Sequence, residues 1–158
     1  MTKPASQMSD EEIRERVTRL AFDGDKLRFR EFLKKLASGV PAGTGIALRG
    51  SVVTNERWED GKPFDADGRG TSDLDVTLVG SEAMDFWDND AFYIPALHTK
   101  PLCDEDDGIA PGLNTLREEL QELAGRPVNF QATANMVLFA RDVLFNESYV
   151  MLIKPGDE

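Results

Sequence analysis

Several residue types that mark particular classes of protein are nearly missing from this sequence. It has one cysteine and one histidine in 158 residues. It therefore cannot form an internal disulfide, and it lacks the ligands for a closed tetrahedral zinc site. The longest apolar runs have about five residues, as in 136–140, whereas a helix that spans a bilayer needs about 20 apolar residues. We therefore expect a cytoplasmic protein with no membrane partner.

Positive charge is also scarce. The chain has 18 lysines and arginines against 29 aspartates and glutamates, which gives a net charge of −11. An acidic chain repels phosphate backbones, so we expect no duplex nucleic acid as a partner. Apolar residues make up 41% and charged residues 30% of the sequence, a composition typical of a folded domain.

The negative charge is concentrated in the middle of the chain. Residues 55–75 contain seven acidic and three basic side chains, a net charge of −4. Residues 82–107 contain eight acidic side chains and one basic side chain, a net charge of −7. Together these two stretches account for the whole −11, so a functional hypothesis should explain their acidity.

The length and the turn residues indicate one domain. We expect a flexible tail at 1–8 and a single domain at 9–158, with long loops at 52–72 and 81–112. The loops are rich in glycine, proline and acidic residues. Within 81–112 the sequence indicates only one helical turn, near 83–87.

Helices are expected in four places. Ser9 and Glu12 form a capping box at the start of the first, and Asp25 can cap the second, which carries Leu27, Phe32, Leu33 and Leu36 at helical spacing. Thr115 and Glu118 form another capping box in a helix over 113–124, and a last helix is expected near 135–145.

Four apolar segments are typical of strands: 46–49, 74–79, 128–132 and 149–153. With the helices between them, their order predicts an α+β (α/β layered) fold.

The start of the second strand contains two aspartates in alternation. In Ser72-Asp73-Leu74-Asp75-Val76, the two carboxylates lie two residues apart, so they project from the same face of a strand. Two neighbouring carboxylates repel each other, and a divalent cation between them removes that repulsion. The alternative is a solvated face of an edge strand.

The first strand ends in Leu48-Arg49-Gly50-Ser51. A glycine at a strand end allows a phosphate to approach the backbone. Taken with the Asp73-Leu74-Asp75 motif, this turn resembles the signature of the DNA polymerase β-like nucleotidyltransferase superfamily. The resemblance covers about residues 25–153 and implies a short mixed β-sheet packed against helices on one side.

The resemblance also implies a function. Asp73 and Asp75 would bind Mg²⁺ or Mn²⁺, and Gly50, Ser51 and Ser72 would form the nucleotide-binding set. The protein would then transfer a nucleoside monophosphate from a nucleoside triphosphate to a hydroxyl acceptor, which is a small molecule, a protein or an RNA end.

The sequence departs from that family in two respects. Between Ser51 and Asp73 lie 21 residues (52–72), whereas the family usually has about a dozen or fewer. The third catalytic carboxylate of the family corresponds here to Asn129, and an amide cannot act as a base. The acids that could substitute for it are Asp65, Asp67 and the run 104–107.

Three alternatives therefore stay open. The chain could be a catalytically degenerate nucleotide- or metal-binding regulatory module of the same fold, for example part of a toxin–antitoxin or defence system. Its acidic loops could instead dock a basic partner protein. The stretch 65–73 also partly fits a calcium loop, although Arg69 stands where a ligand is needed.

The remaining candidates have ordinary explanations. We interpret His98 as a surface-loop residue, and we expect acidic neighbours to raise the pKa of Cys103. The aromatic residues of the 81–112 segment could stack on a nucleobase, but a small satellite core is the commoner role. These are Phe86, Trp87, Phe92 and Tyr93.

Overall fold

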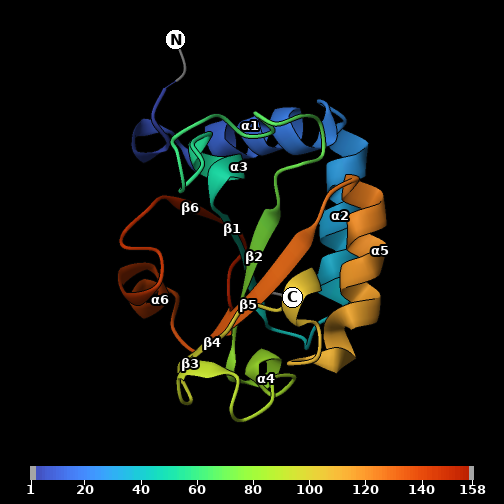
Figure 1. Cartoon of the computed structure of the whole chain (residues 1–158), viewed down its shortest axis with the longest axis vertical. Helices are drawn as coiled ribbons and strands as arrows, with labels where there is room; N and C mark the ends of the chain where they lie inside the picture. Colours follow the sequence, from blue (N-terminus) through green and yellow to red (C-terminus); the bar gives the residue numbers. More distant parts are fainter. Residues whose placement is uncertain (1–2, 157–158) are drawn as a thin grey trace.

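The computed structural model describes residues 3–156 and contains a six-stranded mixed sheet in the order β3-β4-β5-β2-β1-β6 (Figure 1). β2 and β5 are parallel, and the other neighbouring strands are antiparallel. The strands are β1 (Gly45–Arg49), β2 (Leu74–Val79), β3 (Phe92–Ile94), β4 (His98–Thr99), β5 (Val128–Thr133) and β6 (Tyr149–Ile153). The four expected strands are confirmed, and β3 and β4 are additional.

Three helices are long: α1 (Asp10–Phe22), α2 (Lys26–Ser38) and α5 (Asn114–Ala124). The others are α3 (Ser51–Thr54), α4 (Ser81–Met84) and α6 (Met136–Asp142), with 3₁₀ turns η1 (Ala5–Gln7), η2 (Asp104–Asp106) and η3 (Pro111–Leu113). The architecture is thus α+β and layered. In the part of the chain that the structure describes, no helix is both long and apolar enough to cross a membrane.

Two of the expected helix caps are confirmed. The Ser9 hydroxyl accepts from the Glu12 backbone N–H at 3.2 Å, and the Glu12 carboxylate accepts from the Ser9 N–H at 3.1 Å. Asp25 accepts from the N–H of Arg28 at 3.1 Å. These bonds satisfy backbone donors that have no partner within the helix.

Two details of the helix prediction are wrong. Thr115 does not begin a helix, because the chain already turns in η3 and α5 starts at Asn114 without a side-chain cap. Leu27 belongs to α2, but it is exposed and does not join the apolar stripe. It occupies the second position of α2, and the buried face of the helix begins two residues later with Phe29.

One face of the sheet carries the main core. Alternate side chains of β1, β2, β5 and β6 pack against α1, α2 and α5, which is the period-2 pattern of a strand with one face buried. α2 and α5 lie side by side against this face (Figure 1). The strand residues of this core are Ile46, Leu48, Leu74, Val76, Leu78, Val128, Phe130, Ala132, Val150 and Leu152.

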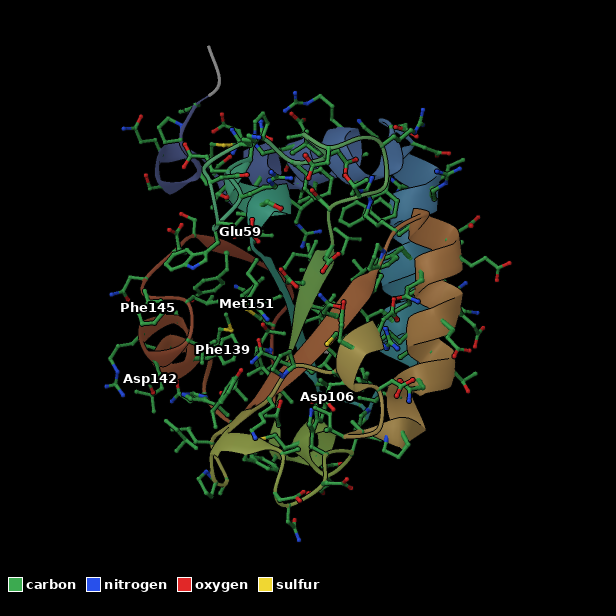
Figure 2. The ribbon with its side chains drawn as sticks, in the orientation of Figure 1. Glu59, Asp106, Phe139, Asp142, Phe145 and Met151 are labelled. Atoms are coloured by element: carbon green, nitrogen blue, oxygen red, sulfur yellow. The ribbon has the colours of Figure 1, made fainter. Side chains whose placement is uncertain are left out.

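The opposite face is covered only in part, by α6. A second cluster joins Phe139 and Met136 of α6 to Ala47 and Val79 of the sheet, with Met151 packed beside them (Figure 2). The expected sheet with helices on one side is therefore only partly correct. The start of β2 and β5 lies beyond this cluster, and polar side chains occupy it.

His98 is a buried residue of β4, so its interpretation as a surface-loop histidine is wrong. Its Nδ1 lies 2.9 Å from the Thr133 hydroxyl, and its Nε2 lies 2.9 Å from a carboxylate oxygen of Asp142. The Asp142 carboxylate also accepts from Arg141, and these two partners lower its pKa to about 2. The His98–Asp142 pair thus connects the end of α6 to the sheet.

Within the described residues, the segment 81–112 packs onto the main core and forms no separate satellite core. Trp87 is buried, and its indole N–H donates to the backbone oxygen of Lys100 at 2.9 Å. Phe86 and Phe92 pack partly buried against the main core, whereas Tyr93 is exposed. This confirms the packing role rather than a base-stacking role for most of these rings.

The free edge of β6 is covered by a side chain. Arg14 of α1 donates from Nη2 to the backbone oxygen of Leu152 at 2.8 Å. A more distant contact, at 3.4 Å, reaches the oxygen of Met151. The guanidinium therefore occupies a backbone acceptor at the end of the sheet.

Candidate functional site

The three residues that the sequence singled out as catalytic lie together. The side-chain amide of Asn129 donates from Nδ2 to Asp73 Oδ2 at 2.9 Å and to Asp75 Oδ1 at 3.2 Å. Asn129 and Asp75 are direct partners in the parallel β2–β5 pair. Residues at matching register positions project from the same face, so the amide is held against both carboxylates.

The Gly50–Ser51 turn lies at the same place. β1 runs antiparallel to β2 and pairs Arg49 with Asp75, so the residue after β1 lies beside the start of β2. Gly50 has φ +82°, and a Cβ atom on it would lie 2.8 Å from Asp75 Oδ2. The backbone conformation therefore favours glycine, and a side chain at this position would displace the Asp75 carboxylate.

The electrostatics of Asp73 favour a bound proton or cation. Partial burial raises the pKa of Asp73, and the negative charges of Asp75, Glu105 and Asp104 raise it further. The hydrogen bond from Asn129 opposes this shift but does not cancel it. A carboxylate whose ionised form is disfavoured gains most from an added positive charge.

Arg49 is part of the site and was missed in the sequence. Its Nε donates to the Thr77 hydroxyl at 3.0 Å, its Nη2 donates to Gln131 Oε1, and the guanidinium lies 5.4 Å from the Phe139 ring centroid. Burial lowers its pKa, and the charge of Asp75 opposes that shift. Side chains alternate between the two faces of a strand, and Arg49 directly follows the apolar Leu48. This alternation could have placed Arg49 on the face opposite to the core, where Asp75 also lies.

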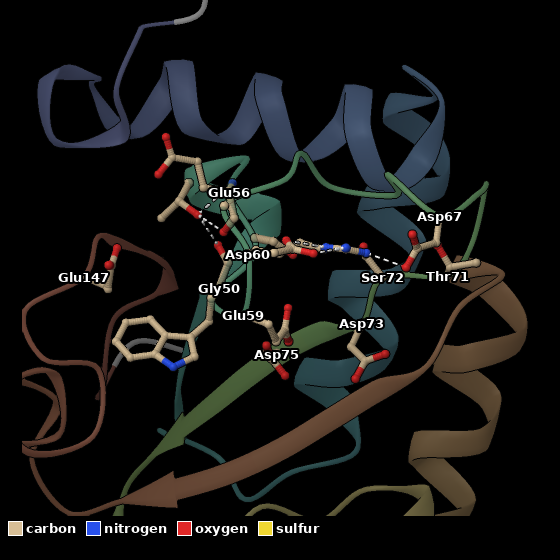
Figure 3. Close-up of a pocket in the computed structure, with 15 residues that line it drawn as sticks. Gly50, Glu56, Glu59, Asp60, Asp67, Thr71, Ser72, Asp73, Asp75 and Glu147 are labelled. Atoms are coloured by element: carbon tan, nitrogen blue, oxygen red, sulfur yellow. Dashed lines mark hydrogen bonds and ion pairs between the residues drawn. The ribbon is translucent and has the colours of Figure 1, made fainter.

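A cavity of about 770 Å³ opens beside these residues (Figure 3). This volume lies within the range of small-molecule sites. Its wall contains seven carboxylates and a single guanidinium, that of Arg57. The lining residues are Gly50, Ser51, Thr54, Glu56, Arg57, Trp58, Glu59, Asp60, Gly61, Asp67, Thr71, Ser72, Asp73, Asp75 and Glu147.

Three of the acids proposed as substitutes for a third carboxylate are paired with arginines. Asp65 accepts from Arg126 at 2.7 Å, Asp67 from Arg57 at 2.6 Å, and Asp104 from Arg117 at 2.7 Å. Within residues 3–156, no group of three His, Cys, Asp or Glu side chains is arranged to hold a metal ion. The calcium-loop alternative fails for the same reason, because arginines occupy the carboxylates of Asp65 and Asp67.

Ser72 lies on the cavity wall, but its side chain has a structural role. Its hydroxyl accepts from the Asp65 N–H at 2.8 Å, and its own N–H donates to Asp65 Oδ1 at 2.9 Å. Burial would raise the pKa of Asp65, but the bonds from Arg126, Ser72 and Gly70 lower it overall. Ser72 therefore fastens the loop that leads into Asp73.

Cys103 lies outside the cavity, and the pKa expectation for it is confirmed. Burial and the neighbouring Glu105 raise the pKa of its thiol. The thiol therefore stays protonated near neutral pH and is a poor nucleophile.

The donor chemistry of the site fits a magnesium ion. Mg²⁺ prefers oxygen ligands, and proteins commonly hold it with one or two carboxylates while substrate phosphates and water complete its shell. The carboxylates of Asp73 and Asp75 both accept from the amide of Asn129, so the two groups lie next to each other. They would be the protein's ligands to the ion.

We predict that Gly50→Ala disturbs Asp75 as well as the backbone. The control is Gly61→Ala, because Gly61 has φ +73° but a Cβ atom on it would meet no atom within 4 Å beyond its chain neighbours. Both variants should lose about 1 kcal/mol of unfolding free energy from backbone strain. Only Gly50→Ala should shift the NMR signals of the Asn129 side-chain amide. Equal amide signals in the two variants would contradict the contact with Asp75.

We predict that the buried Arg126–Asp65 pair holds the loop before Asp73. Arg126→Leu leaves Asp65 without its cation and should cost about 3 kcal/mol in urea unfolding. Arg69→Leu is the control, because the Arg69–Asp23 pair of the same loop is exposed and should cost less than about 1 kcal/mol. Similar losses in both variants would show that burial of the pair is not what matters.

Comparison with known proteins identifies no relative of this chain. No protein-family model matches the sequence, no curated protein is significantly similar to it, and no solved structure matches its fold at a significant level. The function must therefore be argued from the residues of the site.

Proposed function

We propose that the protein is a metal-dependent nucleotidyltransferase with a nucleotidyltransferase-like fold. The observation that supports this most is the meeting of Asp73, Asp75 and the Gly50 turn at one end of the sheet, beside an acidic cavity. Paired carboxylates next to a turn without a side chain suit a substrate that carries phosphate groups and a divalent ion.

In this proposal each residue has a defined task. Asp73 and Asp75 bind Mg²⁺, which when bound neutralises the negative charge of the triphosphate. Gly50 and Ser51 line the cavity at the phosphates, and the missing side chain of Gly50 leaves room beside Asp75. Arg49, fixed by Thr77 and Gln131, holds a positive charge on the strand position paired with Asp75.

The reaction is an in-line displacement at the α-phosphorus. An acceptor hydroxyl oxygen bonds to the α-phosphorus, and the bond from that phosphorus to the bridging oxygen of the β-phosphate breaks. Pyrophosphate leaves with the electron pair of that bond. Asn129 has no basic atom, so the hydroxyl proton is released to solvent through the open cavity.

A second candidate is a binding module of the same fold without turnover. The amide of Asn129, which donates to both carboxylates, favours this alternative. In this arrangement a neutral donor occupies the position from which a general base could accept the hydroxyl proton.

We predict that binding of a nucleoside triphosphate depends on Mg²⁺ and on both aspartates. Asp73→Asn and Asp75→Asn should each weaken Mg²⁺-dependent ATP binding by tenfold or more in calorimetry, since each removes one charged oxygen ligand. Asp67→Asn is the control, because Asp67 lines the same cavity but is paired with Arg57. If both variants bind ATP like the wild type, the proposal is wrong.

We predict that Asn129→Asp separates the two candidates. With radiolabelled triphosphate, Mg²⁺ and water as the acceptor hydroxyl, an active wild type should release pyrophosphate, and the variant should raise the rate because it adds a base. A silent wild type that gains activity in Asn129→Asp would establish the binding module. If both proteins bind ATP and release no pyrophosphate, the nucleotidyltransferase proposal fails.

A further inference from the structure

Two of the largest exposed apolar side chains of the protein form a stacked pair. Trp58 is 73% exposed and Phe145 is 68% exposed. Their ring centroids lie 5.9 Å apart with an angle of 18° between the ring planes. They come from different parts of the chain. Trp58 belongs to the 55–71 loop, and Phe145 belongs to the turn after α6 (Figure 2). Exposed aromatic surface of this kind is typical of a binding site.

The backbone holds Phe145 in this exposed position. Its φ is +50°, and that of the following Asn146 is +63°. A left-handed conformation is rare for a bulky side chain, and such residues cluster at functional sites. The turn thus places the phenyl ring against Trp58 instead of in the nearby cluster around Phe139.

The aromatic pair reaches the cavity of the proposed active site through Trp58, on which Phe145 stacks from outside the lining. Trp58 lines that cavity, and so does Glu147, two residues after Phe145. Gly50, Ser51 and the aspartate pair line the same space. A ligand with phosphates at one end and a flat ring at the other could therefore reach both groups of residues.

We propose that Trp58 and Phe145 bind a planar heterocycle that carries amino groups, the base of the nucleotide. This inference rests on the proposed function, which supplies the phosphate end of the same ligand. Every nucleobase has a flat aromatic face, so any of them can stack on an indole or phenyl ring. Trp58 offers such a face to the cavity, and Phe145 extends the aromatic surface next to it.

The carboxylates that line the cavity with Trp58 favour a bound ring whose edge carries hydrogen-bond donors. Glu56, Glu59 and Glu147 line the cavity around it, and carboxylates only accept hydrogen bonds. An exocyclic amino group donates to a carboxylate, as in adenine, guanine or cytosine. Uracil presents carbonyl oxygens there instead, so it should bind more weakly.

The test uses nucleosides without phosphate or metal, so that it is independent of the aspartate pair. Saturation-transfer NMR with millimolar adenosine and uridine should show contact to the adenosine ring protons and a weaker signal for uridine. Trp58→Ala and Phe145→Ala should reduce adenosine affinity by about tenfold. Trp58→Phe, which keeps a ring, should retain most of it.

Leu27→Ala is the matched control, because Leu27 is 67% exposed and lies on α2, away from the cavity. It should bind adenosine like the wild type. Circular dichroism should show the same fold in all variants, since the truncated side chains are exposed. The proposal is overturned if adenosine gives no signal, if uridine binds equally well, or if Trp58→Ala keeps the wild-type affinity.

Two further results distinguish the claims. Trp58-dependent adenosine binding without any Mg²⁺-dependent ATP binding would retain the ring site and reject the proposed function. ATP binding that depends on the aspartates but is unchanged in Trp58→Ala would retain the proposed function and reject the ring site. If light scattering shows a dimer that Trp58→Ala converts to a monomer, the pair is an interface between copies and the ring site is wrong.

Discussion

The site depends on the way β2 is paired on its two sides. An antiparallel neighbour, β1, ends where β2 begins, so the Gly50 turn lies against Asp75. A parallel neighbour, β5, starts at the same end and brings Asn129 to both carboxylates. Like charges at short range are costly unless they are bound by donors or cations. The hydrogen bonds from Asn129 offset part of the repulsion between the two carboxylates. A bound cation would offset the remainder.

The sequence predicted the parts of the fold that have a clear period. Leu74 and Val76 alternate with Asp73 and Asp75, which placed the apolar side chains in the core and the acids on the other face. The Ser9–Glu12 capping box was equally clear. β3 and β4 were missed because strands of two or three residues contain no detectable period. β4 pairs with β5, which is distant in sequence, and β3 joins the sheet through β4.

The sequence predicted those site residues that lie at the ends of expected strands. It missed the residues whose partners are distant in sequence. Asn129 was found because it occupies the position in the third expected strand where the resembled family has its third carboxylate. Arg49 was visible in the motif, but its partners Thr77 and Gln131 lie on two other strands. Trp58 and Phe145 are 87 residues apart, so the sequence alone could not show that they stack. The arginine partners of Asp65 and Asp67 were hidden in the same way.

The contact between Arg14 and the end of the sheet has a consequence for association between molecules. β6 is an outer strand, and the backbone oxygens of such a strand can accept hydrogen bonds from a strand of another chain. Arg14 occupies the oxygen of Leu152 with a charged group that a second copy would have to displace. The guanidinium thus protects this edge against the growth of intermolecular β-structure, at a place where the apolar residues of β6 would otherwise favour aggregation.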